Sequence, residues 1–143
     1  MSALNLILLI DDSDADNFYH KMIIGRSGIS SETQSLEGSL DGYSYLLKSI
    51  SLEDNSQYPM PQVIFLDINM PAMNGFELLS KFRELPDPYQ RKNGLKIFML
   101  TGSLNPDDRA RATEQYADLV TGFRIKPLTE TIIQEIAREY FSA

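Results

Sequence analysis

Several polar side chains that could do chemistry stand directly after apolar runs, where a strand would end. They are Asp11, Asp12, Asp67, Thr101 and Lys126. The runs span residues 6–10, 63–66, 97–100 and, more weakly, 119–125. If the runs are parallel strands of one sheet, these side chains meet at its carboxyl edge, where open α/β sheets bind ligands. Three carboxylates, a hydroxyl and an ammonium in one cleft would offer an acidic nucleophile, a metal site and a counter-charge for an anion.

The segments between these runs have helical patterns. Apolar residues at positions 15, 18, 19, 22 and 23 recur at helical spacing and predict a first helix, capped by Asp12 or Ser13. A later helix begins at Asn105, with Pro106 in its first turn. Similar apolar spacing predicts helices over residues 40–50, 76–82 and 132–141.

The remaining segments complete the alternation of strand and helix. Residues 31–36 predict a weak, polar strand, and residues 51–62 and 86–94 predict long loops, because prolines interrupt them. The order of elements predicts an α/β fold, a doubly wound five-stranded parallel sheet with helices on both faces.

Composition narrows the class of protein. The 143 residues are enough for one domain, and we expect a single domain over residues 1–143. The absence of cysteine excludes disulfides and thiolate metal sites, and suits the cytoplasm. The net charge of −7 argues against direct binding to nucleic acid or to an anionic membrane. No apolar run approaches the roughly 20 residues that span a bilayer, and the N-terminus lacks the basic segment of a secretory signal.

A motif around Asp67 makes the pattern specific. Met70-Pro71 stands three and four residues after this aspartate, and Gly75 stands eight residues after it. The other markers are the Asp11-Asp12 pair, Thr101-Gly102 and Lys126-Pro127. This set resembles a response-regulator receiver domain, the phosphoacceptor module of two-component signalling, over residues 6–140. The resemblance implies the flavodoxin-like receiver fold and a stand-alone, single-domain regulator in a phosphorelay.

The resemblance also implies a role for each marker. Asp67 would be the nucleophile that takes a phosphoryl group from a histidine kinase or a histidine phosphotransfer protein. Oxygen atoms are the ligands that Mg²⁺ prefers. The implied magnesium ligands are Asp11, Asp12, Asp67 and the backbone carbonyl of Asn69.

Three further residues would act on the phosphoryl group itself. Thr101 would donate a hydrogen bond to a phosphoryl oxygen, and Gly102 would leave space and a backbone N–H beside it. Lys126 would balance the acidic cluster and later contact the phosphate. The Lys126–Pro127 peptide bond is typically cis in the family, which would aim the ammonium into the cleft. We expect a switch and not an enzyme, with catalysis limited to magnesium-dependent autophosphorylation and autodephosphorylation.

Phe123 matches the aromatic switch position of the family. Movement of Thr101 toward the phosphoryl group would free a space for the ring, and the surface nearby would change shape. An ordinary half-buried strand phenylalanine is the alternative interpretation. The affected surface is that of the fourth helix, fifth strand and fifth helix, residues 105–116 and 129–140. It would bind a downstream protein or, in a homodimer, a second copy of the chain, while the first helix and the rim around Lys126 would face the kinase.

Other interpretations of the same residues stay open or fail on spacing. Residues 12–16 begin like an EF-hand calcium loop, but Asn17 stands where its glycine belongs and Ile23 where its glutamate belongs. His20, the single histidine, suits an exposed or partly covered helix position, and we do not expect it to donate phosphate.

Two other function classes compete with the phosphorylated receiver. A receiver-like fold used as a phosphorylation-independent interaction module would not need Asp67 or Lys126. A hydrolase of the aspartyl-phosphate type usually carries an acid two residues after its nucleophile, whereas Asn69 stands there in this chain.

Overall fold

The computed structural model describes residues 4–30, 32–51, 57–85, 94–102 and 104–141. The strands are β1 (Ile7–Ile10), β2 (Thr33–Leu36), β3 (Val63–Leu66), β4 (Lys96–Thr101) and β5 (Val120–Ile125). The helices are α1 (Asp14–Ser27), α2 (Ser39–Ser51), α3 (Gly75–Arg83), α5 (Pro106–Ala110), the π-helical turn η1 (Arg111–Gln115) and α6 (Glu130–Phe141). Most of the predicted loops 51–62 and 86–94 lies outside these residues.

The described strands form one parallel sheet in the order β2-β1-β3-β4-β5. The predicted doubly wound five-stranded sheet is therefore confirmed, including the weak strand near residues 31–36. The order reverses beside β1, because the chain adds β2 on one side of β1 and then β3 on the other. Ligands bind at such reversals in open α/β sheets, outside the carboxyl ends of the strands.

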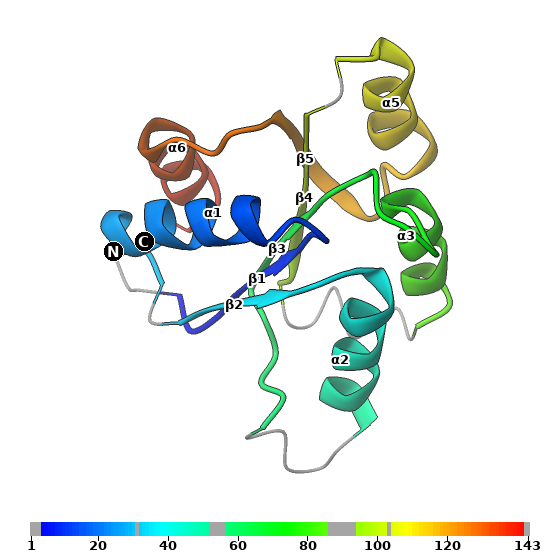
Figure 1. Cartoon of the computed structure of the whole chain (residues 1–143), viewed down its shortest axis with the longest axis horizontal. Coiled ribbons are helices and arrows are strands. Elements are labelled where there is room, and N and C mark those ends of the chain that lie inside the picture. Colours follow the sequence, from blue (N-terminus) through cyan, green and yellow to red (C-terminus); the bar gives the residue numbers. More distant parts are fainter. Residues whose placement is uncertain (1–3, 31, 52–56, 86–93, 103, 142–143) are drawn as a thin grey trace.

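Helices cover both faces of the sheet, so alternate strand residues enter two different cores. Figure 1 shows α1 and α6 on one face, and their apolar residues share a core with Ile7, Leu9 and Phe65. On the other face lie α2 and α3, whose apolar residues share a second core with Leu8 and Ile10. Residues that alternate along a strand point to opposite faces, and a sheet covered on both sides therefore needs continuous apolar strands such as β1.

Helix α1 is present where its apolar spacing predicted it, but it buries a different face. Phe18 is 74% exposed and Met22 is 38% exposed, whereas Asn17 and His20 are buried with Ile24. The side chain of Ser13 caps the helix by accepting a hydrogen bond from the backbone N–H of Asp16. Of the predicted apolar stripe, Ile23 is buried as expected, whereas Phe18, Tyr19 and Met22 face outward. The Ser13 cap and the contact of Asn17 with Asp11 hold the start of the helix in this rotation.

The predicted start of α5 is confirmed, and α3 has a cap that the sequence analysis did not name. Asn105 caps α5 by accepting from the backbone N–H of Asp107, and Pro106 occupies the first turn. Asn74 and Glu77 form a reciprocal capping box at the start of α3. Within the part of the chain that the structure describes, no helix is long and apolar enough to cross a membrane.

Candidate functional site

The strand ends bring the predicted site residues to one edge of the sheet. The backbone N–H of Asp67 donates to the carbonyl of Ile10 at 3.0 Å, which places Asp67 beside the end of β1 where Asp11 follows. The backbone N–H of Lys126 donates to the carbonyl of Thr101 at 2.8 Å. These bonds extend the parallel ladder by one residue on each strand, so the side chains emerge together as predicted.

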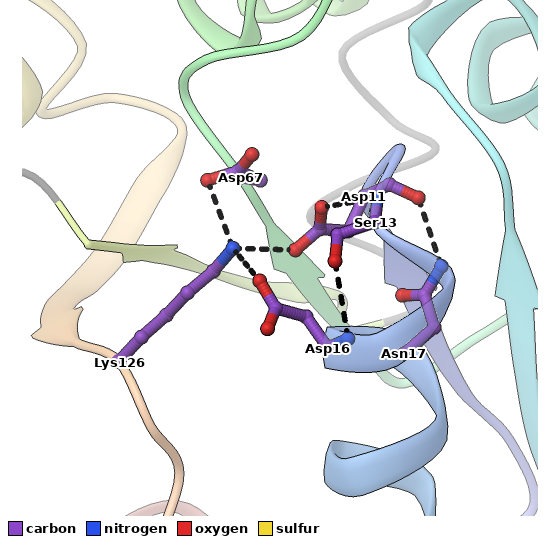
Figure 2. Close-up of polar contacts among 6 residues, drawn as sticks. All are labelled: Asp11, Ser13, Asp16, Asn17, Asp67 and Lys126. Carbon is purple, nitrogen blue, oxygen red and sulfur yellow. Dashed lines mark hydrogen bonds and ion pairs between the residues drawn. The ribbon is translucent and has the colours of Figure 1, made fainter.

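Lys126 lies at the centre of an acidic cluster (Figure 2). Its Nζ is 2.7 Å from Oδ2 of Asp11 and 3.4 Å from Oδ1 of Asp67. The side chains of Asp11 and Asp67 are each 7% exposed. Oxygen atoms of Asp11, Asp12 and Asp67 all lie within 4.8 Å of one another. Three carboxylates at this spacing can hold a hard divalent cation.

The electrostatics of the cluster are unbalanced. Burial and the negative charge of Asp11 raise the pKa of Asp67 from 3.8 to about 6, although Lys126 opposes the shift. Burial lowers the pKa of Lys126, but its hydrogen bonds to Asp11 and Asp16 outweigh this effect and hold the pKa above its ordinary value. The ammonium therefore stays charged at neutral pH, while the carboxylates around it repel one another.

Asp16 is a fourth carboxylate of this cluster, and its role was not foreseen from the sequence. Its Oδ2 lies 2.7 Å from Nζ of Lys126, and the hydrogen bond to this ammonium lowers the pKa of Asp16. Asp16 lies on the first turn of α1, four residues after Asp12, which precedes the N-cap Ser13. In the sequence, the only feature that drew attention to Asp16 was the alternation of aspartates over residues 12–16. That alternation suggested a calcium loop, and it did not indicate that Asp16 would pair with a lysine.

The start of α1 fixes the backbone beneath the cluster. The backbone N–H of Ser13 donates to Oδ1 of Asp11 at 2.9 Å. The side-chain amide of Asn17 donates to the backbone carbonyl of Asp11 at 2.8 Å. Figure 2 shows both contacts next to the carboxylate that faces Lys126. Asp11 is thereby held from three directions, which orients its carboxylate before any ligand arrives.

The segment after Asp67 is held by backbone contacts. The N–H of Gly75 donates to the carbonyl of Ile68 at 2.8 Å, and a Cβ at position 75 would overlap the carbonyl oxygen of Asp67. Glycine is therefore required there for close approach of α3 to the strand end. Ala72 has a φ of 69°, in the left-handed region that non-glycine residues seldom adopt. Such local strain is common at functional sites.

The remaining predicted residues are placed as follows. Thr101 is fully buried at the end of β4, and the adjoining Gly102 is exposed. Phe123 is only 4% exposed, so it is a buried residue in this state, and the guanidinium of Arg109 lies 5.7 Å from its ring centroid. Asn69 is exposed on the loop that follows β3. The Lys126–Pro127 peptide bond is cis.

The expected exposed or partly covered position of His20 was wrong. It is 2% exposed, and burial lowers its pKa, partly opposed by the nearby charge of Asp16. Its ring packs edge-on against Tyr19, with ring centroids 5.8 Å apart. The rotation of α1 buries this residue, and a single sequence does not show how a helix is rotated about its axis.

The family of this chain follows from the comparison of its sequence with protein families. The family model for the response regulator receiver domain matches residues 7–138. The chain belongs to this family. It is a receiver domain of a response regulator in two-component signalling, and its fold and strand-end cluster match that assignment.

Known proteins of this family are similar along most of the receiver domain. The response regulator Rcp1 of Synechocystis sp. is 31% identical over 103 residues, which cover 72% of this chain and 65% of Rcp1. The probable methanogenesis regulatory protein FilR2 of Methanothrix harundinacea is 28% identical over 144 residues, covering 95% of this chain and 83% of FilR2. The chain thus spans just under two thirds of Rcp1.

Solved structures share the fold. A two-component response regulator from Cytophaga hutchinsonii superposes with a TM-score of 0.83 at 30% identity, covering 96% of this chain and 97% of that one. The Mn²⁺-bound form of Rcp1 superposes with a TM-score of 0.69 at 24% identity, covering 97% of this chain and 96% of that one. At this lower identity the second structure supports the fold alone.

Proposed function

We propose that this receiver accepts a phosphoryl group on Asp67 from a histidine kinase or a histidine phosphotransfer protein, in a reaction that depends on Mg²⁺. The observation that carries the proposal is the convergence of Asp67 with Asp11, Asp12 and Lys126 at one edge of the sheet. A buried carboxylate that only capped a turn would need neither an ammonium nor two further carboxylates at this distance.

The proposed transfer uses Asp67 as the nucleophile. A carboxylate oxygen of Asp67 forms a bond to phosphorus while the bond from phosphorus to the donor imidazole nitrogen breaks, and the nitrogen keeps the electron pair. Lys126, held beside Asp67, would balance negative charge on the phosphoryl oxygens during the transfer. Thr101 and the backbone N–H of Gly102 would then contact the aspartyl phosphate from the end of β4.

The donor set suits a divalent cation. Asp11, Asp12 and Asp67 supply carboxylate oxygens within 4.8 Å of one another, and the backbone carbonyl of Asn69 is the further proposed ligand. Bound Mg²⁺ would supply positive charge that stabilises the phosphoryl oxygens. Rcp1 has been solved in a Mn²⁺-bound form. For this chain we propose Mg²⁺, because carboxylate and carbonyl oxygens are the ligands that it prefers.

The packing around Phe123 supports a change at the surface of α5, η1, β5 and α6. Phe123 pairs with Met99 in the ladder of β4 and β5, two residues before Thr101 on β4. Its ring faces Arg109 on α5. A shift of Thr101 toward an aspartyl phosphate would change the space open to this ring and, through Arg109, the outer surface. We propose that a downstream protein, or a second copy in a homodimer, binds there.

The direct test is to incubate the protein with Mg²⁺ and acetyl phosphate and to measure the intact mass. We expect a gain of one phosphoryl group in the wild type and none in Asp67→Asn. Asp118→Asn is the matched control, since it removes a distant exposed carboxylate, and it should be modified as the wild type is. An unmodified wild type would instead favour a phosphorylation-independent interaction module. Rapid turnover of small phosphate esters would favour a hydrolase.

A further inference from the structure

Lys126 divides its contacts unequally among the carboxylates around it. Nζ lies 2.7 Å from both Asp11 and Asp16, but 3.4 Å from Asp67. The ammonium is therefore held on the α1 side of the cluster, by one residue from the end of β1 and one from the first turn of α1. Figure 2 shows Nζ of Lys126 joined to these two carboxylates and to Asp67.

Asp11 has two competing demands on its carboxylate. Its Oδ1 accepts the backbone N–H of Ser13 at 2.9 Å, and its Oδ2 accepts Lys126 at 2.7 Å. Each oxygen keeps a further lone pair, but a metal ion bound at Oδ2 would lie close to the positive charge of Lys126, which repels it. The backbone contact is part of the turn into α1, so Oδ2 is the oxygen that can be released, provided that Lys126 keeps another partner.

We propose that Asp16 is a positioning residue that holds Lys126 when Asp11 binds a divalent cation. This inference rests on the proposed metal-dependent function. Asp16 makes an equally short contact to Nζ, and its side chain is 42% exposed compared with 7% for Asp11. The more exposed carboxylate of Asp16 would hold the ammonium of Lys126, so that the buried carboxylate of Asp11 could bind the metal ion. Lys126 then stays charged and in place beside Asp67.

The start of α1 places Asp16 beside Lys126. Its backbone N–H is held by the Ser13 side chain at 3.2 Å, which fixes the first turn of α1 at the rim of the site. Asp14, two residues earlier on the same turn, is exposed and carries the same charge, whereas Lys126 forms its ion pairs with Asp11, Asp16 and Asp67. The chain thus contains its own control for the effect of charge alone.

The test measures Mg²⁺ affinity by calorimetry, with no phosphate donor present. Asp16→Asn should weaken binding by roughly threefold, because Lys126 would then interact more strongly with Asp11, and a partly exposed ion pair contributes a modest free energy. Asp14→Asn removes one charge from the same helical turn and should change the affinity by much less. Equal losses in the two variants would overturn the proposal.

A second measurement separates positioning from a direct effect of charge on the metal. In a Lys126→Met background, Asp16→Asn should no longer weaken Mg²⁺ binding, since the residue through which Asp16 acts is gone. An undiminished loss in that background would also overturn the proposal. If Lys126→Met does not fold, the Mg²⁺ affinities of Asp16→Asn and Asp14→Asn still test the proposed role of Asp16.

Acetyl phosphate labelling of the wild type distinguishes failure of the proposed function from failure of the proposed role of Asp16. If the wild type gains no phosphoryl group and binds no Mg²⁺, the proposed function fails. If the wild type is labelled and Asp16→Asn matches Asp14→Asn in Mg²⁺ affinity, only the role of Asp16 fails.

Discussion

Two groups of charged residues in this receiver show opposite uses of an ion pair. At the strand ends, Lys126 lies among Asp11, Asp16 and Asp67, and its side chain is 16% exposed. Between α3 and the chain after η1, Arg83 pairs with Asp118, and their side chains are 42% and 57% exposed. The first group has more negative than positive charge, whereas the second is a balanced pair.

The surroundings of Arg83 also differ from those of Lys126. Its guanidinium donates to both carboxylate oxygens of Asp118 and to the backbone carbonyl of Gln115, and it lies 4.7 Å from the ring centroid of Tyr116. Three hydrogen bonds hold the guanidinium, and the carboxylate of Asp118 balances its charge. The strand-end cluster, by contrast, is repulsive without a cation, and such unbalanced buried charge is typical of a site that binds a ligand.

The largest effect should come from removing the central ammonium. Without divalent metal at pH 7, Lys126→Met should lower the free energy of unfolding by about 3–5 kcal/mol, because it leaves buried carboxylates without their counter-charge. Urea denaturation measures this loss. The loss should shrink when Mg²⁺ is added or when the pH falls to about 4, where Asp67 is protonated. A loss that is the same under all three conditions would contradict the electrostatic explanation.

Asp67→Asn should have the next largest effect, and in the opposite direction. The pKa of Asp67 is raised from 3.8 to about 6, so the folded state binds its proton more tightly than the unfolded chain does. The resulting stability is fully present below pH 3.8 and is lost as the pH rises through about 6. The neutral asparagine avoids that loss and should be more stable than wild type by about 2–3 kcal/mol at pH 7.5.

Denaturation at two pH values without metal checks this prediction. The advantage of Asp67→Asn should disappear near pH 3.5, where the wild-type carboxyl is protonated in both states. A gain of the same size at pH 3.5 and pH 7.5 would show that packing, and not charge, explains it.

Substitutions of two glycines near the cluster test how closely the backbone is packed there. Gly75→Ala places a Cβ against the backbone of Asp67 and Ile68, and should cost about 1–3 kcal/mol because backbone must move. Gly102→Ala is the matched control for stability, since its Cβ would meet no heavy atom within 4 Å. Thermal denaturation should show a loss for the first variant alone. Gly75→Ala should also slow labelling by acetyl phosphate, because it displaces Asp67.

The smallest effect is expected at the exposed pair. Asp118→Asn should cost less than about 1 kcal/mol, and the loss should fall at high salt, because solvent screens a pair that is roughly half exposed. Urea denaturation at low and high salt measures it. A cost as large as that of Lys126→Met would show that burial does not distinguish the two groups.

Much of the fold could be predicted from local patterns. Apolar runs directly followed by Asp11, Asp67 and Thr101 predicted which strands end at the site, and the ladder contacts confirm that these ends are adjacent. Asn105 and Pro106 predicted the start of α5 because capping depends only on neighbours in the sequence. The π-helical turn η1 that follows was not predicted.

The site could be predicted less completely. Asp11, Asp12, Asp67 and Lys126 were identified from their positions at strand ends, but Asp16 and the burial of His20 were not. Both depend on the rotation of α1 about its axis, and the apolar spacing of Phe18 and Met22 indicated the wrong inner face. The Ser13 cap and the contact of Asn17 with Asp11 are local, but the ion pair of Asp16 with Lys126 and the packing of α1 against α6 join residues far apart in the chain.

The sequence alone therefore determined the order of strands and helices, the residues at the strand ends and the chemical class of the site, because these depend on periodicity and on neighbouring residues. Only the tertiary structure decided which carboxylates share Lys126, how strongly Asp67 holds its proton and which side of α1 is buried. Those properties depend on distances and burial between segments more than 50 residues apart, as between Asp16 and Lys126, 110 positions apart. Local propensities do not determine such distances.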